Sequence, residues 1–421
     1  MCRHTRPKDS MQPGVVSRIS HRNPTNAPYL IHGNTTEWWD KLDSRFPRME
    51  EHFKLGFSDR VKVGATAAID TVIRTGAASM VGTFSIPRGF RPSKVREMLE
   101  HREHYETMAL SGDPSRFFVT PPDNVRIERS EPQRPFFTPK GGRCVDLRFV
   151  SPFEPSIPVL RERYAAETRN MHAHARYWHH SDGPRPTIVA IHGFGADPYW
   201  LNEWFFSLPW FYELGCDILL YTLPFHGRRQ MMISPHSGHG LFAQGLAWLN
   251  EAVAQGVHDF RIYLDYLLED IGAPAAGVTG VSLGGYHSAL LAAVEPRLAF
   301  AIPNVPVISL ADIMMEWEPL GTFGRTLLRA IGMDLHDLRE VMAVHCPLTY
   351  APTLSKERLF IIGGVADKLA PPKHSRLLWE HWDQCDIHWF PGSHILHLDR
   401  GEYLRQMARF MGSLHFLPPR D

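Results

Sequence analysis

The sequence predicts an α/β fold, in which a mostly parallel sheet carries helices on both faces. From Arg143 onward, stretches typical of strands alternate with stretches typical of helices, a pattern that favours a parallel sheet. Two of the strand-like stretches, "PTIVAIHGFG" and "CDILLYTLPFHGRR", are nearly continuously apolar, as expected for strands buried on both faces. A third observation is "TGVSLGG", where a serine between glycines stands at the end of such a strand.

The remaining elements can be followed along the chain. "RCVDLRFVSP" and "MHAHARYWHH" alternate as early strands do. Helical spacing predicts a helix between Val257 and Ile271, ended by Gly272. "AAGVTGV" then predicts a strand and "GGYHSALLAAVEP" a helix that Pro296 closes. Three further strands are predicted in "LAFAIPN", "RLFIIGGVADKLAPP" and "CDIHWFPGSHILHL", and a closing helix carries Leu404, Met407, Phe410 and Met411 on one side.

The change of pattern at residue 143 divides the chain into two predicted parts. Residues 1–142 form an N-terminal extension, with a partly disordered tail followed by helical pieces, and residues 143–421 form the α/β domain. In the extension, Asp70 and Arg74 are spaced as an i,i+4 pair suited to a helix surface. Residues 309–350 contain helical pieces that form either a cap over a pocket or helices packed on the sheet.

Composition is that of a globular protein and excludes several classes. The chain has 421 residues, with 45 basic and 45 acidic side chains, so its net charge gives no general reason to expect a nucleic-acid or anionic-membrane partner. We find no apolar run long enough to span a bilayer. The basic N-terminus lacks the apolar stretch of a secretory signal, which leaves a plain tail or an organelle presequence. The five cysteines are far apart and without C-x-x-C spacing, which predicts reduced thiols in a cytoplasmic protein.

Ser282 is the first candidate for chemistry. A strand that turns abruptly into a helix holds its apex residue in a strained conformation, and Gly280 and Gly284 stand where that turn leaves little room for a side chain. The serine hydroxyl would lie at the N-terminus of the helix, where backbone N–H groups favour developing negative charge. The motif alone also fits an ordinary tight turn, but the strand before it and the helix after it favour a nucleophile.

The carboxyl ends of the predicted strands bring further groups to the same edge of the sheet. Histidine can take the proton of a serine hydroxyl, and a carboxylate holds the imidazole in the required tautomer, so we expect Ser282, His394 and Asp367 to act as nucleophile, base and acid. The backbone N–H groups of Leu283 and Phe194 are the candidate donors to an oxyanion.

Five motifs in this order, "HGFG", "LPFHGRR", "GVSLGG", "GVADKLAPP" and "PGSHI", resemble the α/β-hydrolase superfamily, whose triad runs serine, acid, histidine along the chain. The resemblance covers roughly residues 143 to 415. It implies an eight-stranded, mostly parallel sheet and hydrolysis of esters, thioesters or amides without a metal. "RFVSP", "GVTGVSLGG" and "GSHI" are more narrowly similar to a poorly characterised branch of intracellular α/β-hydrolase-domain proteins that are suspected of acting on acylated lipids.

Several assignments have alternatives. Ser393 replaces the glycine that usually precedes the catalytic histidine, which leaves His397 as a second candidate base. Asp312, Asp386 or Asp399 could supply the acid in place of Asp367. We expect His226 to bond backbone groups in its loop, with pocket lining as the alternative, and His192 to stabilise the loop around the oxyanion site.

The histidines of one strand raise the question of a metal. His172 and His174, like His179 and His180, lie near one another on a predicted strand, but no carboxylate or cysteine stands at a telling spacing, so a solvated strand face is favoured over a metal site. Arg228 and Arg229 could meet an anionic substrate, although a solvated or ion-paired role is more common. We therefore expect no metal and no cofactor.

The sequence thus predicts a serine hydrolase that cleaves a carboxylic ester, with a thioester or amide as variants. Aromatic residues in "YWLNEWFFSLPWFYEL" predict an apolar acyl site and a lipid-like small-molecule substrate. Two alternatives remain open. The first is a catalytically inactive hydrolase fold that serves as a binding or scaffold module, which the unassigned residues 1–142 favour. The second is an acyltransferase on the same fold.

Overall fold

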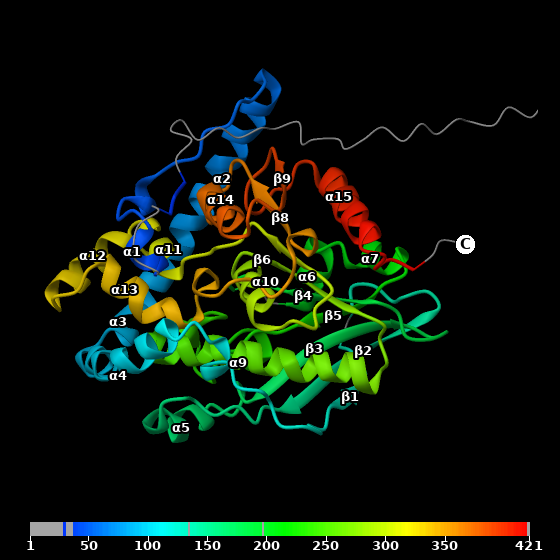
Figure 1. Cartoon of the computed structure of the whole chain (residues 1–421), viewed down its shortest axis with the longest axis horizontal. Helices are drawn as coiled ribbons and strands as arrows, with labels where there is room; N and C mark the ends of the chain where they lie inside the picture. Colours follow the sequence, from blue (N-terminus) through cyan, green and yellow to red (C-terminus); the bar gives the residue numbers. More distant parts are fainter. Residues whose placement is uncertain (1–27, 31–36, 134, 196–197, 419–421) are drawn as a thin grey trace, which may run out of the picture.

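A nine-stranded sheet forms the centre of the molecule (Figure 1). The computed structural model describes residues 28–30, 37–133, 135–195 and 198–418. Strand order is β1-β2-β3-β5-β4-β6-β7-β8-β9, with antiparallel pairs from β1 to β5 and parallel pairs from β5 to β9. The strands are Glu128–Ser130 (β1), Gly142–Val150 (β2), His172–His180 (β3), Thr187–Ile191 (β4), Asp217–Tyr221 (β5), Ala276–Val281 (β6), Ala301–Asn304 (β7), Phe360–Gly364 (β8) and Asp386–Phe390 (β9).

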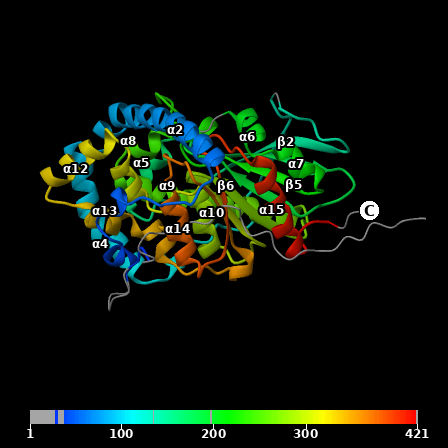
Figure 2. The same ribbon diagram turned by 90° about the horizontal axis from the view of Figure 1, so that it is seen from above.

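Helices lie on both faces of the sheet (Figures 1 and 2). In the N-terminal part they are Trp38–Lys41 (α1), Phe57–Phe84 (α2), Ile86–Gly89 (α3) and Pro92–Leu110 (α4). Between the strands follow Pro158–Ala165 (α5), Tyr199–Phe205 (α6), Leu208–Glu213 (α7), His239–Ala243 (α8), Leu246–Asp265 (α9) and Leu283–Val294 (α10). The rest are Leu310–Glu316 (α11), Leu320–Ala330 (α12), Leu335–Met342 (α13), Pro372–His381 (α14) and Arg400–Ser413 (α15).

The apolar strands bury both of their faces. All residues of β4, β5 and β6 are buried, because successive side chains of a strand point to opposite sides and each side meets a layer of helices. Val189 and Ile191 join the larger core, which contains α9 and α10 residues, whereas Ile188 and Ala190 join a second core with residues of α7 and α15. These two cores enclose the sheet and hold the carboxyl ends of its parallel strands at one edge.

The predicted fold class is confirmed, with one strand more than expected. The additional strand, β1, precedes residue 143 and pairs with β2 at the edge of the sheet. The predicted helix before "AAGVTGV" begins earlier, at Leu246, and continues as a π-helical turn over Tyr266–Asp270. Of the described residues, none belongs to a helix that is both apolar and long enough to cross a bilayer.

The N-terminal extension packs on the rest of the chain. Helix α2 contacts α8 and α12, and α4 contacts α9 and α13. The division into an extension and an α/β domain at residue 143 stays a prediction. Cys2 and the basic N-terminal segment, for which a plain tail or an organelle presequence was left open, lie outside the described residues.

Candidate active site

Ser282 occupies a strained turn between β6 and α10. Its φ of 58° and ψ of −113° lie in a region that non-glycine residues rarely adopt. A Cβ on Gly280 would stand 2.2 Å from the Gly284 carbonyl oxygen, and one on Gly284 would stand 2.0 Å from the Ile191 oxygen. Both glycines are therefore required by close backbone approaches, as the sequence predicted.

Two backbone segments flank the Ser282 side chain. Leu283 is the first residue of α10, so its N–H group has no intrahelical acceptor and lies at the positive end of the helix dipole. On the other side, a Cβ on Gly193 would lie 3.4 Å from Ser282 Cβ, so the turn after β4 passes directly beside the serine. Phe194 follows in this turn and lines the same cavity as Ser282 and Leu283. The two residues predicted to supply oxyanion donors thus both border the cavity.

Ser282 opens into an apolar cavity of about 60 Å³. Its walls come from α2, α3, α8, α10 and the α11–α12 region, and they comprise Val81, Ile86, Phe194, Phe242, Leu283, Val307, Leu310, Ile313, Met314, Trp317 and Leu320. A second small apolar cavity shares Ile86, Met314 and Leu320 with it and continues toward Leu328 and Leu338. Helices α11 and α12 therefore form part of the cavity wall, and a cap function for residues 309–350 stays a prediction.

The aromatic segment that was expected to line this cavity lies elsewhere. Phe206, Leu208 and Phe211 belong to the core on one face of the sheet. Tyr199 and Trp200 instead border a larger cavity of about 600 Å³, with Arg176 and Arg228 in its wall. None of the aromatic side chains of this segment lines the cavity at Ser282, so the source predicted for its apolar lining was wrong.

His394 and Asp367 form a buried pair at the ends of β9 and β8. The imidazole Nδ1 donates to Asp367 Oδ2 at 2.7 Å, and both side chains are almost fully buried. The other carboxylate oxygen accepts the N–H groups of Leu369 at 2.9 Å and Ala370 at 2.7 Å. Burial raises the pKa of Asp367. Burial opposes the charge on His394, but the carboxylates of Asp367 and Asp70 outweigh it and raise the pKa of the imidazole.

A hydrogen bond ties this pair to the cavity. Trp317, which lines the cavity beside Ser282, donates its indole N–H to the Leu369 carbonyl oxygen at 2.8 Å. Among the described residues, the Ser282 hydroxyl has no hydrogen-bond partner.

Asp70 of α2 is a further residue of this site, although the sequence pattern predicted it on a helix surface. Its carboxylate is fully buried, and its Oδ2 accepts the backbone N–H of His394 at 2.7 Å and that of Lys368 at 3.2 Å. Its other oxygen, Oδ1, is buried without a partner among the described residues. Arg74 also turns inward and donates to the Lys368 carbonyl oxygen. Asp70 and Arg74 therefore do not form the predicted pair on the helix surface. The burial of Thr66, Ala78 and Val81 shows which face of α2 packs inward.

The alternative acids and base have other partners. His397 Nε2 donates to the His394 carbonyl oxygen and its Nδ1 accepts the Tyr403 hydroxyl, and burial lowers the pKa of His397 to about 3. Asp312 accepts the hydroxyl of Ser309, the N-cap residue of α11, and pairs with Arg339. Asp399 contacts His388, and Asp386 begins β9 at the exposed end of the strand. Of the carboxylates considered, only Asp367 meets the imidazole of His394 among the described residues.

Two histidines hold the loops around the serine. His192 Nδ1 donates to the Gly193 carbonyl oxygen at 2.8 Å, and its Nε2 accepts the Leu223 N–H at 3.1 Å, as predicted for a loop-stabilising role. His226 Nδ1 donates to the Pro224 oxygen, which agrees with the backbone-bonding interpretation. Burial lowers the pKa of His192 to about 4 and that of His226 well below its usual value.

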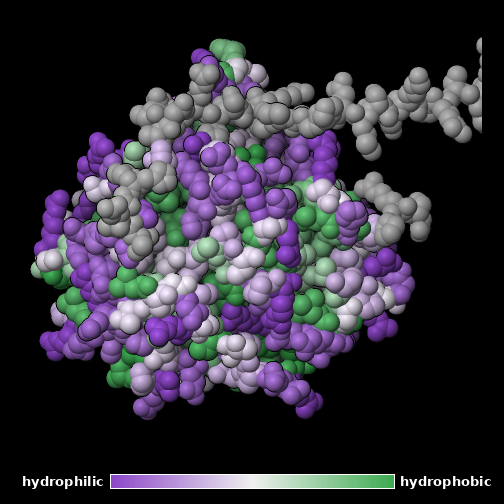
Figure 3. All heavy atoms as spheres, in the orientation of Figure 1, coloured by the Kyte–Doolittle hydropathy of each residue, from purple (hydrophilic) through white to green (hydrophobic). Residues whose placement is uncertain are grey.

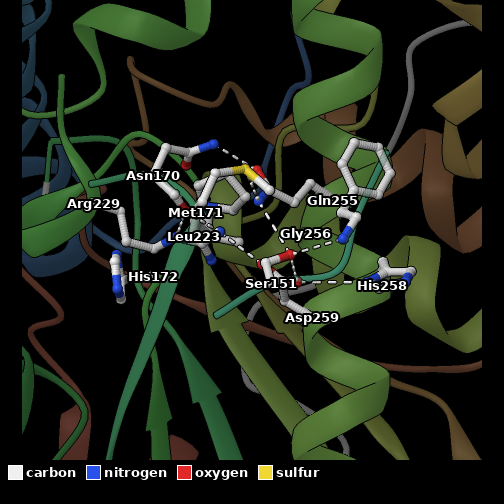
Figure 4. A network of polar contacts seen from close by, with 12 residues as sticks. Ser151, Asn170, Met171, His172, Leu223, Arg229, Gln255, Gly256, His258 and Asp259 are labelled. Atoms are coloured by element: carbon white, nitrogen blue, oxygen red, sulfur yellow. Dashed lines mark hydrogen bonds and ion pairs between the residues drawn. The ribbon is translucent and has the colours of Figure 1, made fainter. Parts of the chain in front are cut away.

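A buried polar network contacts the loop that carries His226 (Figure 4). Arg229 pairs with Asp259 at 2.6 Å and donates to the Asn170 carbonyl oxygen, while the Asn170 side chain accepts the Phe225 N–H. Ser151 donates to the other oxygen of Asp259. Arg228 pairs with Asp146 at 3.0 Å. Both arginines are thus ion-paired, and neither lines the cavity at Ser282.

The histidines of β3 do not form a metal cluster. His180 pairs with Asp217, and burial lowers the pKa of His174 to about 3. Within the described residues, the one group with metal-ligand spacing is Asp334, His336 and Asp337. The two carboxylates form the capping box of α13, and His336 contacts Asp40, so these groups have structural partners.

The chain was compared with family models, curated proteins and solved structures. The chain matches no family model. It is 30% identical over 316 residues to "Uncharacterized protein MT2702" of Mycobacterium tuberculosis strain CDC 1551 / Oshkosh, covering 71% of this chain and 70% of that protein, and equally so to "Uncharacterized protein Rv2627c" of strain H37Rv. Among solved structures, the acetyl xylan esterase from Paenibacillus sp. R4 superposes with a TM-score of 0.50 at 13% identity, covering 80% of this chain and 98% of that one.

The strand order, the turn at Ser282 and the structural neighbour define an α/β-hydrolase fold. By sequence, the chain belongs to the family of the two mycobacterial proteins.

Proposed function

We propose that the protein is a serine hydrolase that cleaves a carboxylic ester through an acyl-enzyme intermediate. The observation that carries this proposal is the position of Ser282, strained at the strand-to-helix turn and facing an apolar cavity whose wall is hydrogen-bonded to the loop of Asp367. A strained, cavity-facing serine is suited to nucleophilic catalysis, and the buried His394–Asp367 pair is the proposed base and acid.

In the proposed reaction, the Ser282 hydroxyl turns toward Nε2 of His394 and attacks the ester carbonyl carbon. His394 takes the hydroxyl proton, and Asp367 stabilises the resulting imidazolium through the Nδ1 contact of 2.7 Å. The N–H groups of Leu283 and Phe194 would stabilise the oxyanion. His394 then returns the proton to the departing alkoxide. Water, deprotonated by the same imidazole, attacks the acyl carbon. The bond to Ser282 Oγ breaks as His394 returns the proton to that oxygen, and the carboxylic acid is released.

The cavity supports a short apolar acyl group. Its volume of about 60 Å³ equals the share of about two water molecules. Its walls carry aliphatic and aromatic side chains, so they favour the acyl chain over a charged group. The solved neighbour from Paenibacillus sp. R4 is named for an acetyl ester, which agrees with a small acyl site. The flexible thioether of Met314 stands where a longer chain would continue.

A fluorophosphonate probe tests the proposal directly, because it reacts with an activated serine. We expect stoichiometric labelling of the wild-type protein, loss of labelling in Ser282→Ala, and loss of p-nitrophenyl acetate hydrolysis by at least about a thousandfold. The Ser413→Ala variant is the control, because it removes a serine hydroxyl from α15. It should be labelled as the wild type is.

The alternatives give different outcomes. A folded protein that resists labelling would favour the inactive binding module and end the proposal. Labelling together with acyl transfer to an added alcohol, and without release of free acid, would identify an acyltransferase.

A further inference from the structure

Helix α2 presents an uncharged face to solvent. Along residues 63–87, the exposed positions carry only apolar, small or hydroxyl side chains, since both charged residues of this stretch, Asp70 and Arg74, point inward. Large apolar side chains stand out from the helix: Phe57 is 85% exposed, Val61 59% and Val72 73%. Isolated surface apolar residues are normal, but several of them along one helix, as on α2, suit an interaction surface.

The charged side chains at the two ends of this face are mainly basic. Between residues 54 and 91, the exposed charged side chains are basic: Lys54, Arg60, Lys62, Arg88 and Arg91. The acidic residues in this interval are Asp59, which is partly covered and lies near Lys62, and the buried Asp70. The protein as a whole is neutral, so this segment is a local concentration of positive charge around an apolar row. An anionic surface with an apolar interior complements both features.

Helix α6 adds tryptophans on the same side of the molecule. Figure 2 shows α2 and α6 along one side of the fold, and α6 carries Trp200 and Trp204, each about half exposed. Tryptophan is the side chain that prefers the boundary between lipid headgroups and acyl chains. The face seen in Figure 3 is, in contrast, mostly hydrophilic, with small separate apolar areas.

A second copy of the chain is a poorer fit for this face. The 28-residue helix is about 42 Å long and about 10 Å wide, so its outer face would bury about 400 Å² on each copy. Stable protein interfaces bury about 800 Å² on each partner. The basic residues of two copies would also repel each other.

We propose that the outer face of α2 docks on an anionic lipid surface. Phe57, Val61 and Val72 would enter the headgroup boundary, and the flanking basic residues would contact lipid phosphates. The inner face of the same helix supplies Val81 to the cavity at Ser282, so docking would bring the cavity wall next to the lipid. The docking itself does not depend on the proposed esterase activity.

Flotation with lipid vesicles tests the docking on the full chain. The wild type should bind vesicles of equal parts phosphatidylglycerol and phosphatidylcholine, bind pure phosphatidylcholine weakly, and lose affinity as salt is raised. Val61→Asp combined with Val72→Asp should weaken binding to the anionic vesicles by at least about tenfold. Arg60→Gln combined with Lys62→Gln should weaken it and flatten the salt dependence.

Matched controls separate this inference from others. Val159→Asp on α5, at a valine that is 69% exposed on another element, should bind as the wild type does. Ser282→Ala should also bind normally, so that a failure of docking and a failure of the proposed catalysis are distinguishable. Equal binding of the Val61/Val72 and Val159 variants, or no binding of the wild type, would overturn the proposal. A dimer in sedimentation velocity that dissociates only in the Val61/Val72 variant would assign the face to a second copy.

Discussion

Asp70 accepts the backbone N–H of His394 at 2.7 Å although 324 positions separate the two residues in the chain. The same carboxylate oxygen accepts the N–H of Lys368, next to Asp367. One side chain of α2 thus joins the two loops that carry the proposed base and acid. Its negative charge also contributes to the raised pKa of His394.

Replacing Asp70 should change the pH profile of the reaction. Asp70→Asn removes the charge and keeps the shape, so the pKa of His394 should fall and the acid limb of the kcat/KM profile should move to lower pH, because His394 must be neutral to act as base. Asp70→Ala also leaves two backbone N–H groups unpaired, so kcat should fall about tenfold and stability by about 1–3 kcal/mol. Asp59→Asn, on the same helix but near Lys62, is the control. An unchanged acid limb in Asp70→Asn would show that this carboxylate does not act on His394.

Alanine substitutions at Gly284 and Gly76 should change the stability of the protein in opposite directions. The Cβ of Gly284→Ala would stand 2.0 Å from the Ile191 oxygen, so the turn at Ser282 must shift, and we expect a loss of about 3 kcal/mol and of fluorophosphonate labelling. A Cβ at Gly76 in α2 meets no atom within 4 Å, so Gly76→Ala should stabilise the protein by about 0.5–1 kcal/mol. Urea unfolding measures both changes. Equal effects of the two substitutions would contradict the close approach at Gly284.

The sequence was sufficient for features that depend on local backbone geometry. Gly280 and Gly284 mark the turn at Ser282 because no other residue fits the contacts, and the apolar strands before Asp367 and His394 place both residues at one edge of the sheet. It was insufficient for Asp70, because the i,i+4 spacing does not say which face of a helix packs inward. The cavity walls were missed for the same reason, since Val81 and Leu310 meet there only through long-range packing.

Shortening Met314 should lengthen the acyl chain that the protein accepts. Met314 lines both apolar cavities, so Met314→Ala should join them and shift the preferred p-nitrophenyl ester from acetate toward butyrate or hexanoate, with a rise of about tenfold in the relative kcat/KM of the longer ester. Met411→Ala removes a buried methionine of the other core and should cost about 2–5 kcal/mol of stability without this shift. The same chain-length preference in both variants would place the acyl chain elsewhere.

Buried neutral histidines should make the fold sensitive to acid. Burial lowers the pKa of His192 and His287 to about 4 and that of His345 to about 3, whereas a histidine of the unfolded chain titrates near 6.5. Below about pH 6.5 the unfolded chain therefore binds protons that the folded protein does not. Their contribution to stability is complete above pH 6.5 and is lost as the pH falls toward 4, by up to about 1.4 kcal/mol per pH unit for each histidine.

One histidine can be isolated by comparing variants. His287 Nδ1 donates to the Leu283 carbonyl oxygen, and its Nε2 has no partner among the described residues, so a glutamine amide can replace the bond without titrating. The free energy of unfolding of His287→Gln, measured in urea between pH 6.5 and 4.5, should fall less steeply with acid than that of the wild type. His52→Gln, at an exposed position, should keep the wild-type slope. Parallel slopes for all three proteins would mean that His287 binds its proton equally well in the folded and unfolded chain, and that the acid sensitivity arises from other groups.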